Sequence, residues 1–257
     1  MSNFGKINTR TKIIAITAIF SALYAALRII PTVPMVGTGA SFSLSDMIVP
    51  LYGILLGPYV GGASIVIGTF AAFGMGKAPV FLGLDFLPAL VNAMALGFLV
   101  RRKWWPVVVL NAILLVVFVL NPLTLNFVNT PFGSFPFVWL HVAAFVVLIS
   151  PLGRKAAQWV DTLKPTLATA GLAILAFAGT MMQHLTGNIL FEVVLGQIAR
   201  TMEIGAYAIR WNAIFYLYPW ERLALVLLAV LIGVPAIRVL KKSFFASEKK
   251  PIPTQAK

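Results

Sequence analysis

The sequence contains no cysteine, only two histidines and only seven acidic residues among its 257 residues. Without cysteine the protein can form no disulfide bond, no catalytic thiolate and no cysteine-ligated metal site. It also lacks the short motifs of zinc proteases, of serine hydrolases and of nucleotide-binding P-loops. We therefore expect no catalytic residue, no bound metal and no cofactor in this chain.

Charged residues are scarce as well, at 11% of the chain, whereas hydrophobic residues make up 60%. A soluble domain of this length cannot hide so much apolar side chain, because its surface is too large relative to its volume. Long apolar stretches separated by clustered charges are typical of polytopic membrane proteins. We predict an all-α integral membrane protein with six to eight transmembrane helices, two of them short, located as a multi-pass protein in the cell (plasma) membrane.

The net charge of +13 is distributed in a pattern that follows membrane topology. If the N-terminus is cytoplasmic and the number of spans is even, 15 of the 20 basic residues fall on the cytoplasmic side: Lys6, Arg10, Lys12, Arg101, Arg102, Lys103, Arg154, Lys155, Lys164, Arg238, Lys241, Lys242, Lys249, Lys250 and Lys257. This distribution obeys the positive-inside rule. We therefore place the N- and C-termini in the cytoplasm, and we expect contact with the lipid bilayer but none with nucleic acid.

The apolar stretches predict a single transmembrane domain over residues 1–246 and a disordered cytoplasmic tail over residues 247–257. Eight membrane segments are expected, at residues 12–30, 46–57, 61–73, 80–100, 104–120, 137–149, 166–185 and 218–239. In the stretch between the last two, Glu192, Gly196, Arg200 and Glu203 share one helical face. We interpret residues 186–217 as an amphipathic helix lying at the outer membrane interface.

The stretch of residues 42–62 (FSLSDMIVPLYGILLGPYVGG) predicts an unusually short helix. Ser43 or Ser45 can cap its start, Asp46 suits the positive end of the helix dipole, and Gly57 with the proline after it ends the pattern. The 12 residues from Asp46 to Gly57 give about 18 Å of helix, whereas a hydrocarbon core is about 30 Å thick. Such a helix must be shielded by others or line a polar cavity. Asp46 itself fits a cap better than a ligand contact.

The first apolar stretch carries Ala18, Ala22 and Ala26 at intervals of four residues. Small residues at this spacing form a smooth stripe on a helix, which lets another helix pack closely within a membrane. The stripe alone is consistent with packing inside the protein and with contact to another subunit.

The alanine stripe and the segment after it together resemble the substrate-binding S components of energy-coupling factor (ECF) vitamin transporters. In that family an Ala-x-x-x-Ala face on the first helix is followed by a loop and then by a short helix reading roughly S-D-I-P-x-L-x-G-x-x-x-G-P-x-x-G. With one residue inserted before the first proline, the matching positions are Ser45, Asp46, Pro50, Gly57, Pro58 and Gly61. The last span, PWERLALVLLAVLIGVPAIRVLKK, resembles the family's sixth helix.

The resemblance covers residues 12–130 and 218–242, whereas residues 131–217 carry extra helices and the outer amphipathic segment. It implies that the chain is the substrate-binding subunit of an ABC-type uptake transporter, and that it captures a small micronutrient, a vitamin or its precursor, at the outer face. It also implies that Ala18, Ala22 and Ala26 dock a transmembrane coupling subunit. ATP is then hydrolysed by partner ATPase subunits of the ECF module, and this chain binds no cofactor.

Polar and ionisable side chains at membrane depth are costly, so each is a candidate for substrate binding. Asp85 and Asn92 fall on one face of the expected helix at residues 80–100, and Ala89 between them leaves room for a ligand. The alternative for Asp85 is a helix N-cap, since Pro88 follows it closely.

Four further candidates lie near the expected outer side: Trp139, His184, Trp220 and Glu221. Glu221 begins the last span, where it also suits the helix dipole. The two tryptophans can stack on a flat substrate or anchor the protein at the membrane interface. His184 can contact a ligand or make a structural hydrogen bond, and two histidines without an acidic partner at ligand spacing do not predict a metal site.

Arg28 and Lys77 also lie on the expected outer side, where they can meet a carboxylate or a phosphate or extend to the membrane interface. The small number of charges and the several aromatic residues favour a small, flat, weakly charged substrate.

Two other functions stay open on the sequence. A stand-alone proton-coupled secondary transporter would use Asp85 or Glu221 as a proton relay. A multi-pass membrane enzyme would need a paired acid, base and nucleophile, which the sequence does not show.

Overall fold

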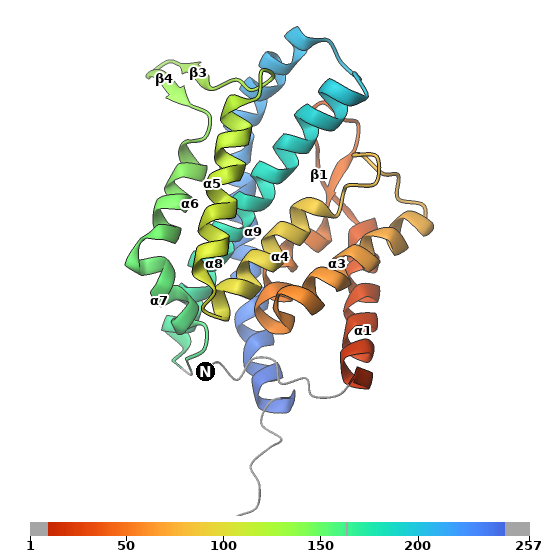
Figure 1. The fold of residues 1–257 in the computed structure, drawn as a ribbon, viewed down its shortest axis with the longest axis vertical. Helices are drawn as coiled ribbons and strands as arrows, with labels where there is room; N and C mark the ends of the chain where they lie inside the picture. Colours follow the sequence, from red (N-terminus) through yellow and green to blue (C-terminus); the bar gives the residue numbers. More distant parts are fainter. Residues whose placement is uncertain (1–9, 163, 245–257) are drawn as a thin grey trace, which may run out of the picture.

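The computed structural model describes residues 10–162 and 164–244. Within these ranges the chain forms a bundle of helices with two small antiparallel hairpins (Figure 1). The start of α1 (Arg10–Ile29) and the end of α9 (Ile204–Phe244) lie at the same end of the bundle. The tail predicted at residues 247–257 lies outside the described residues.

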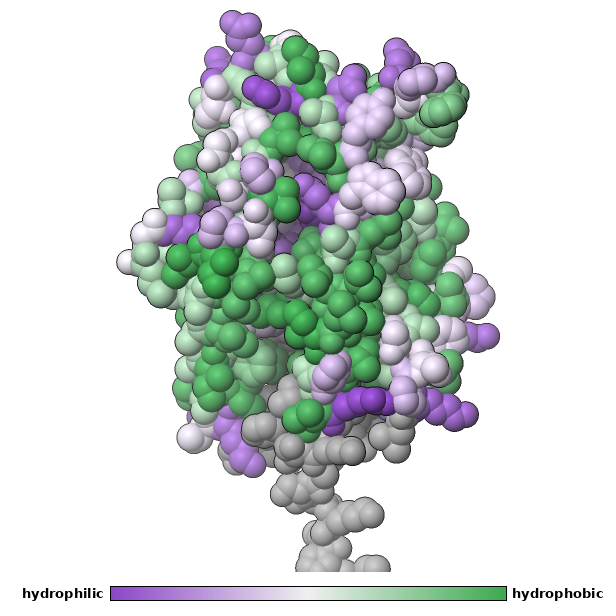
Figure 2. Space-filling view, turned by 180° about the vertical axis from the view of Figure 1, so that it is seen from behind, coloured by the Kyte–Doolittle hydropathy of each residue, from purple (hydrophilic) through white to green (hydrophobic). Residues whose placement is uncertain are grey.

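Five further helices follow the apolar stretches of the sequence: α3 (Gly57–Gly74), α4 (Leu87–Val100), α5 (Trp104–Leu120), α6 (Trp139–Ile149) and α8 (Pro165–Leu190). A short polar helix, α7 (Pro151–Trp159), lies between two of the expected segments. The face of the bundle seen in Figure 2 is largely apolar along its middle, with hydrophilic residues mostly toward its two ends. This distribution matches a protein whose flank faces lipid rather than water.

Four stretches are long and apolar enough to cross a membrane: Arg10–Ile29, Val49–Gly74, Pro165–Ile198 and Ile204–Val239. A fifth span results if α6 and α7, which meet at a bend of 73°, form one broken span. The helices α4 and α5 are apolar but shorter, at 14 and 17 residues. The described residues therefore form an all-α bundle with four helices, or five with the bent pair, of membrane-spanning length and composition.

Two stretches between the expected membrane segments form hairpins. Strand β1 (Pro31–Pro34) pairs with β2 (Ser41–Ser43), and β3 (Phe127–Thr130) pairs with β4 (Gly133–Pro136). In the first hairpin Pro31 lies opposite Ser43 and Pro34 lies opposite Ser41.

The segment predicted as one short helix consists of three successive turns: a 3-10 turn at Leu44–Met47, α2 (Val49–Leu51) and a π-helical turn, η2 (Tyr52–Leu56). Asp46 caps its start, because its carboxylate accepts a hydrogen bond from the Ser43 backbone N–H at 3.1 Å. Gly57 ends it with a φ of +82°, in the left-handed region that favours glycine. The predicted cap and the predicted turn are both confirmed.

Glycines allow this short segment to pack backbone against backbone on its neighbours. A Cβ atom placed on Gly53 would meet the carbonyl oxygen of Ala93 in α4, and one placed on Gly97 would meet the backbone of Pro58 in α3. The segment, α3 and α4 therefore form a closely packed unit around buried side chains such as Ile54 and Leu96.

Two predictions are wrong, one about a separate helix and one about where a helix begins. No separate amphipathic helix forms at residues 186–217, because α8 continues into a π-helical turn, η3 (Phe191–Ile198), and α9 begins at Ile204. Glu192, expected on a solvated face, is fully buried and contacts Thr124. In addition, α4 begins at Leu87 instead of residue 80, since the residues before it form turns held by Asp85.

Candidate functional site

A cavity lies where the β1–β2 hairpin, the loop before α4, the C-terminal half of α8 and the N-terminal half of α9 meet. It contains about 990 Å³ of space not filled by protein atoms, including its open mouth. Its apolar wall is formed by Phe42, Phe81, Phe191, Trp211, Ile214 and Leu217. An apolar wall combined with a few converging polar groups is typical of a site for a small molecule.

Trp211 is held rigidly in the apolar wall. Its indole N–H donates to the backbone carbonyl of Leu123 at 2.9 Å. Its ring lies edge-on to Phe137 and Phe191, with ring centroids 5.2 and 5.4 Å away. A ring fixed in this way offers a ligand contact area at little cost in side-chain entropy.

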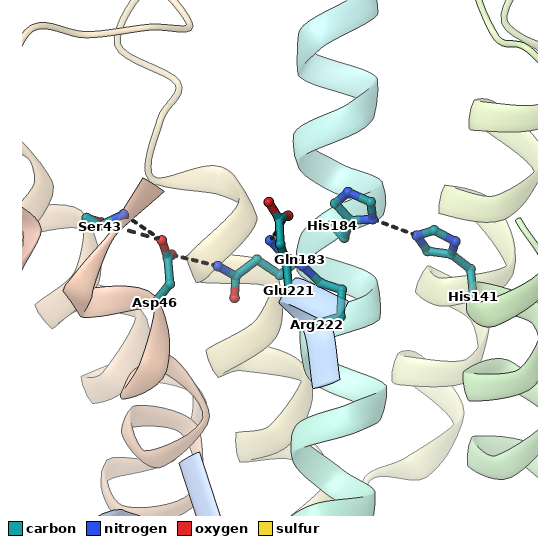
Figure 3. Close-up of polar contacts among 7 residues, drawn as sticks. All are labelled: Ser43, Asp46, His141, Gln183, His184, Glu221 and Arg222. Carbon is teal, nitrogen blue, oxygen red and sulfur yellow. Dashed lines mark hydrogen bonds and ion pairs between the residues drawn. The ribbon is translucent and has the colours of Figure 1, made fainter. Parts of the chain in front are cut away.

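A chain of hydrogen bonds runs along the polar side of the cavity, and Figure 3 shows the part of it formed by Ser43, Asp46 and Gln183. Asn92 in α4 donates through Nδ2 to Gln183 Oε1 in α8 at 2.7 Å, and Gln183 Nε2 donates to Asp46 Oδ1 at 2.8 Å. The other oxygen of Asp46 accepts from the backbone of Ser43 in β2. The chain thus joins two helices of the bundle to the hairpin.

Gln183 is the central member of this chain, so replacing it is expected to destabilise the protein. Gln183→Leu leaves the buried amide of Asn92 without an acceptor, which costs about 1–3 kcal/mol. Thermal unfolding of the purified protein measures the loss. Gln197→Leu is the matched control, since Gln197 is exposed and its bond to Asn121 lies at the surface; we expect a change below about 0.5 kcal/mol there. Equal stability of the two variants would contradict the role of the chain.

Arg28 and Lys77 meet at another wall of the cavity. Arg28 is buried at the end of α1 and donates to the hydroxyl of Tyr24 at 3.3 Å and to the backbone carbonyl of Asp85 at 3.2 Å. The Lys77 ammonium donates to the backbone carbonyl of Arg28 at 2.8 Å. Burial lowers the pKa of Lys77 and the positive charge of Arg28 lowers it as well, whereas Asp46 and Asp85 raise it.

Arg222 in α9 is the third cation that lines the cavity. It is buried, lies 3.5 Å from the carboxylate of Glu221, and has its guanidinium 5.2 Å from the ring centre of Phe42. The contact with Phe42 brings β2 and α9 together over the cavity.

The two histidines form a stacked pair behind the cavity (Figure 3). His141 Nε2 and His184 Nδ1 lie 3.0 Å apart, so one ring donates its proton to the other. Tyr218 stacks on both rings, with centroid distances of 5.2 and 5.0 Å. His184 lines the cavity whereas His141 does not. No group of three potential metal-ligating side chains occurs within residues 10–162 and 164–244.

The structure brings together only some of the candidates predicted from the sequence. Asp85, His184 and Glu221 line the cavity. Asn92 is buried behind Gln183 and does not line it. Trp139 and Trp220 do not line the cavity and are 42% and 75% exposed.

Asp85 has a different role from the predicted helix cap. Its two carboxylate oxygens accept hydrogen bonds from the backbone N–H groups of Val80 and Phe81, at 2.9 and 3.0 Å. It therefore shapes the loop before α4 rather than the first turn of the helix. Asp46 lines the cavity in addition to capping its helix.

Three lining residues were not among the candidates from the sequence, namely Gln183, Asn188 and Arg222, whereas Arg28 and Lys77 were. All three are polar residues near the ends of apolar stretches, which is the signal that could have found them. The signal is ambiguous, because interfacial anchors share it.

The alanine stripe faces away from the bundle. Ala18, Ala22 and Ala26 are exposed, whereas Ser21 and Tyr24 on the opposite face of α1 are buried. The stripe therefore does not pack inside this chain.

Comparison with protein-family models, with curated proteins and with solved structures found no match.

Proposed function

We propose that this protein is the substrate-binding subunit of an ECF-type uptake transporter in the cell membrane. In this role it captures a small micronutrient at the outer face and docks on a coupling subunit for ATP-driven import. The observation that carries the proposal is the cavity under the β1–β2 hairpin, in which buried polar side chains converge inside an otherwise apolar bundle. Buried charges within apolar helices are retained where they serve a ligand or transport pathway.

The proposed topology has eight membrane segments. The turns between Leu44 and Leu56 form one short segment, and α6 with α7 forms one broken segment. The helix α8 together with η3 forms a third segment. The other five are α1, α3, α4, α5 and α9. Eight crossings leave both termini in the cytoplasm and place the cavity toward the outer face. The positive-inside distribution of lysine and arginine supports this orientation.

The proposed docking face is the stripe of Ala18, Ala22 and Ala26. Three small exposed side chains spaced by one helical turn let a partner helix approach the α1 backbone closely. Larger apolar residues, Ile14 and Ile19, border the stripe and are exposed too. This face lies opposite the side of α1 that carries Arg28 into the cavity, so docking and ligand binding use separate surfaces.

Reconstitution in liposomes tests the proposal. We expect no uptake by the purified chain alone under a proton gradient, and ATP-dependent uptake once the coupling subunit and ATPases from the same genome are added. Uptake by the chain alone would overturn the proposal in favour of a proton-coupled secondary transporter.

A further inference from the structure

The arrangement of charges in the cavity indicates the chemistry of its ligand. Arg28 and Lys77 are held side by side by the hydrogen bond from the Lys77 ammonium to the Arg28 carbonyl. Within the part of the chain that the structure describes, neither of them forms an ion pair; the recorded ion pair joins Arg222 and Glu221. Two adjacent cations without a contacting counter-charge create a position that an anion stabilises.

The carboxylates in the cavity are directed to other partners. Both oxygens of Asp85 accept backbone N–H groups of its own loop. Asp46 accepts from Ser43 and from Gln183. These carboxylates therefore do not neutralise Arg28 or Lys77 by direct contact.

The partnerless polar atoms of the cavity are hydrogen-bond donors. Arg28 Nε, Arg222 Nε and Asn188 Nδ2 are buried and have no hydrogen-bond partner among the described residues. Their residues line the cavity and are only 7%, 2% and 6% exposed. Buried donors without an acceptor are unfavourable, so a ligand that supplies acceptor oxygens is favoured over one that supplies further donors.

We propose that the cavity binds a small organic anion, whose carboxylate or phosphate group is held by Arg28 and Lys77 and whose apolar part lies against Phe191 and Trp211. The inference rests on the proposed function, because it names the substrate class of the same site. It replaces the weakly charged substrate expected from composition, since Arg28, Lys77 and Arg222 all line the cavity. Arginine and lysine both suit this role, the first through a fixed fork of donors and the second as a compact charge.

Thermal stabilisation of the purified full-length protein by matched probes tests the proposal. Benzoate and phenyl phosphate carry the two candidate acidic groups on one ring, and benzamide is their neutral counterpart. A ligand that binds only the folded state raises Tm. We expect at least one of the two acids to raise Tm and benzamide to have no effect. The acid that raises Tm more then identifies the preferred acidic group.

Single substitutions test whether Arg28 and Lys77 hold the acidic group. Arg28→Gln and Lys77→Gln are each expected to weaken binding of the acid about tenfold or more, as loss of a charge-assisted hydrogen bond predicts. Lys103→Gln removes an exposed lysine that does not line the cavity and leaves binding unchanged. Lys77 lies in a loop and is partly exposed, so its variant keeps the test valid where Arg28→Gln fails to fold.

Three outcomes would overturn the proposal: equal stabilisation by benzamide, no stabilisation by either acid, or unchanged binding of the acid in a folded Lys77→Gln protein. Failure here is distinguishable from failure of the transport function. ATP-dependent uptake of a neutral or cationic compound would contradict the proposed anionic ligand but support the transport function. Binding of the acids without ATP-dependent uptake by any assembled complex would support the anionic ligand but contradict the transport function.

Discussion

Uptake is expected to fall to background when Ala18 and Ala22 are both replaced by tryptophan, while ligand binding by the purified subunit stays unchanged. The two alanines are exposed on α1, so the new rings do not displace any buried side chain of this chain. On the proposed docking face, however, two indoles prevent a partner helix from approaching the α1 backbone. Transport assays of the assembled complex and binding assays of the isolated subunit measure the two effects separately.

Ala224→Trp provides the matched control. Ala224 is also an exposed alanine on a long apolar helix, but it lies on α9 away from the stripe. We expect normal uptake in this variant. Normal uptake in the Ala18/Ala22 double variant would show that the stripe faces lipid only. Lost binding in a folded double variant would show that this face belongs to the ligand site.

Gly53→Ala is expected to give the largest loss of stability. The added methyl group would fall on the carbonyl oxygen of Ala93, and backbone on both sides has to move to admit it. Forcing an extra carbon into a packed interior costs about 1–3 kcal/mol, sometimes more, and each kcal/mol lowers Tm by about 2–4 °C in a chain of this size. Thermal unfolding in detergent measures the change.

Gly205→Ala is the control for this substitution. Gly205 lies in the first turn of α9, and a Cβ atom there has no heavy atom within 4 Å. Alanine is favoured over glycine in a helix by about 0.5–1 kcal/mol, so Tm should stay the same or rise. If Gly53→Ala unfolds at the same temperature as Gly205→Ala, the close contact between the short segment and α4 does not contribute to stability.

Features that depend on local sequence are predicted well. Apolar stretches predict the long helices, and the pair Gly57-Pro58 predicts the turn that the positive φ of Gly57 confirms. The prediction of an amphipathic helix at residues 186–217 is wrong because the polar residues there suggest a face in contact with water. Glu192 instead turns inward to Thr124, a partner 68 residues away in the sequence. A helical-face pattern does not reveal whether a polar face meets water or a distant hydroxyl group.

The site is predicted less completely, because long-range contacts decide which polar residues face it. Gln183 lies 137 residues from Asp46, and Arg28 lies 57 residues from the carbonyl it contacts. The tryptophans show the same limit. Trp211 is fully buried in the wall and Trp220 is exposed, although both are aromatic residues of one helix near the expected membrane interface.

The first hairpin has a consequence for how a ligand enters. Both β1 residues paired with β2 are prolines, Pro31 and Pro34, and proline has no N–H to donate to a sheet. All four residues of β1 are exposed. Few hydrogen bonds and little apolar burial therefore oppose local opening of this strand, whereas the floor of the cavity is fixed by the chain from Asn92 to Asp46. Strand β1 is therefore the least restrained wall of the cavity, whereas β2 is held in place through Ser43 and Phe42.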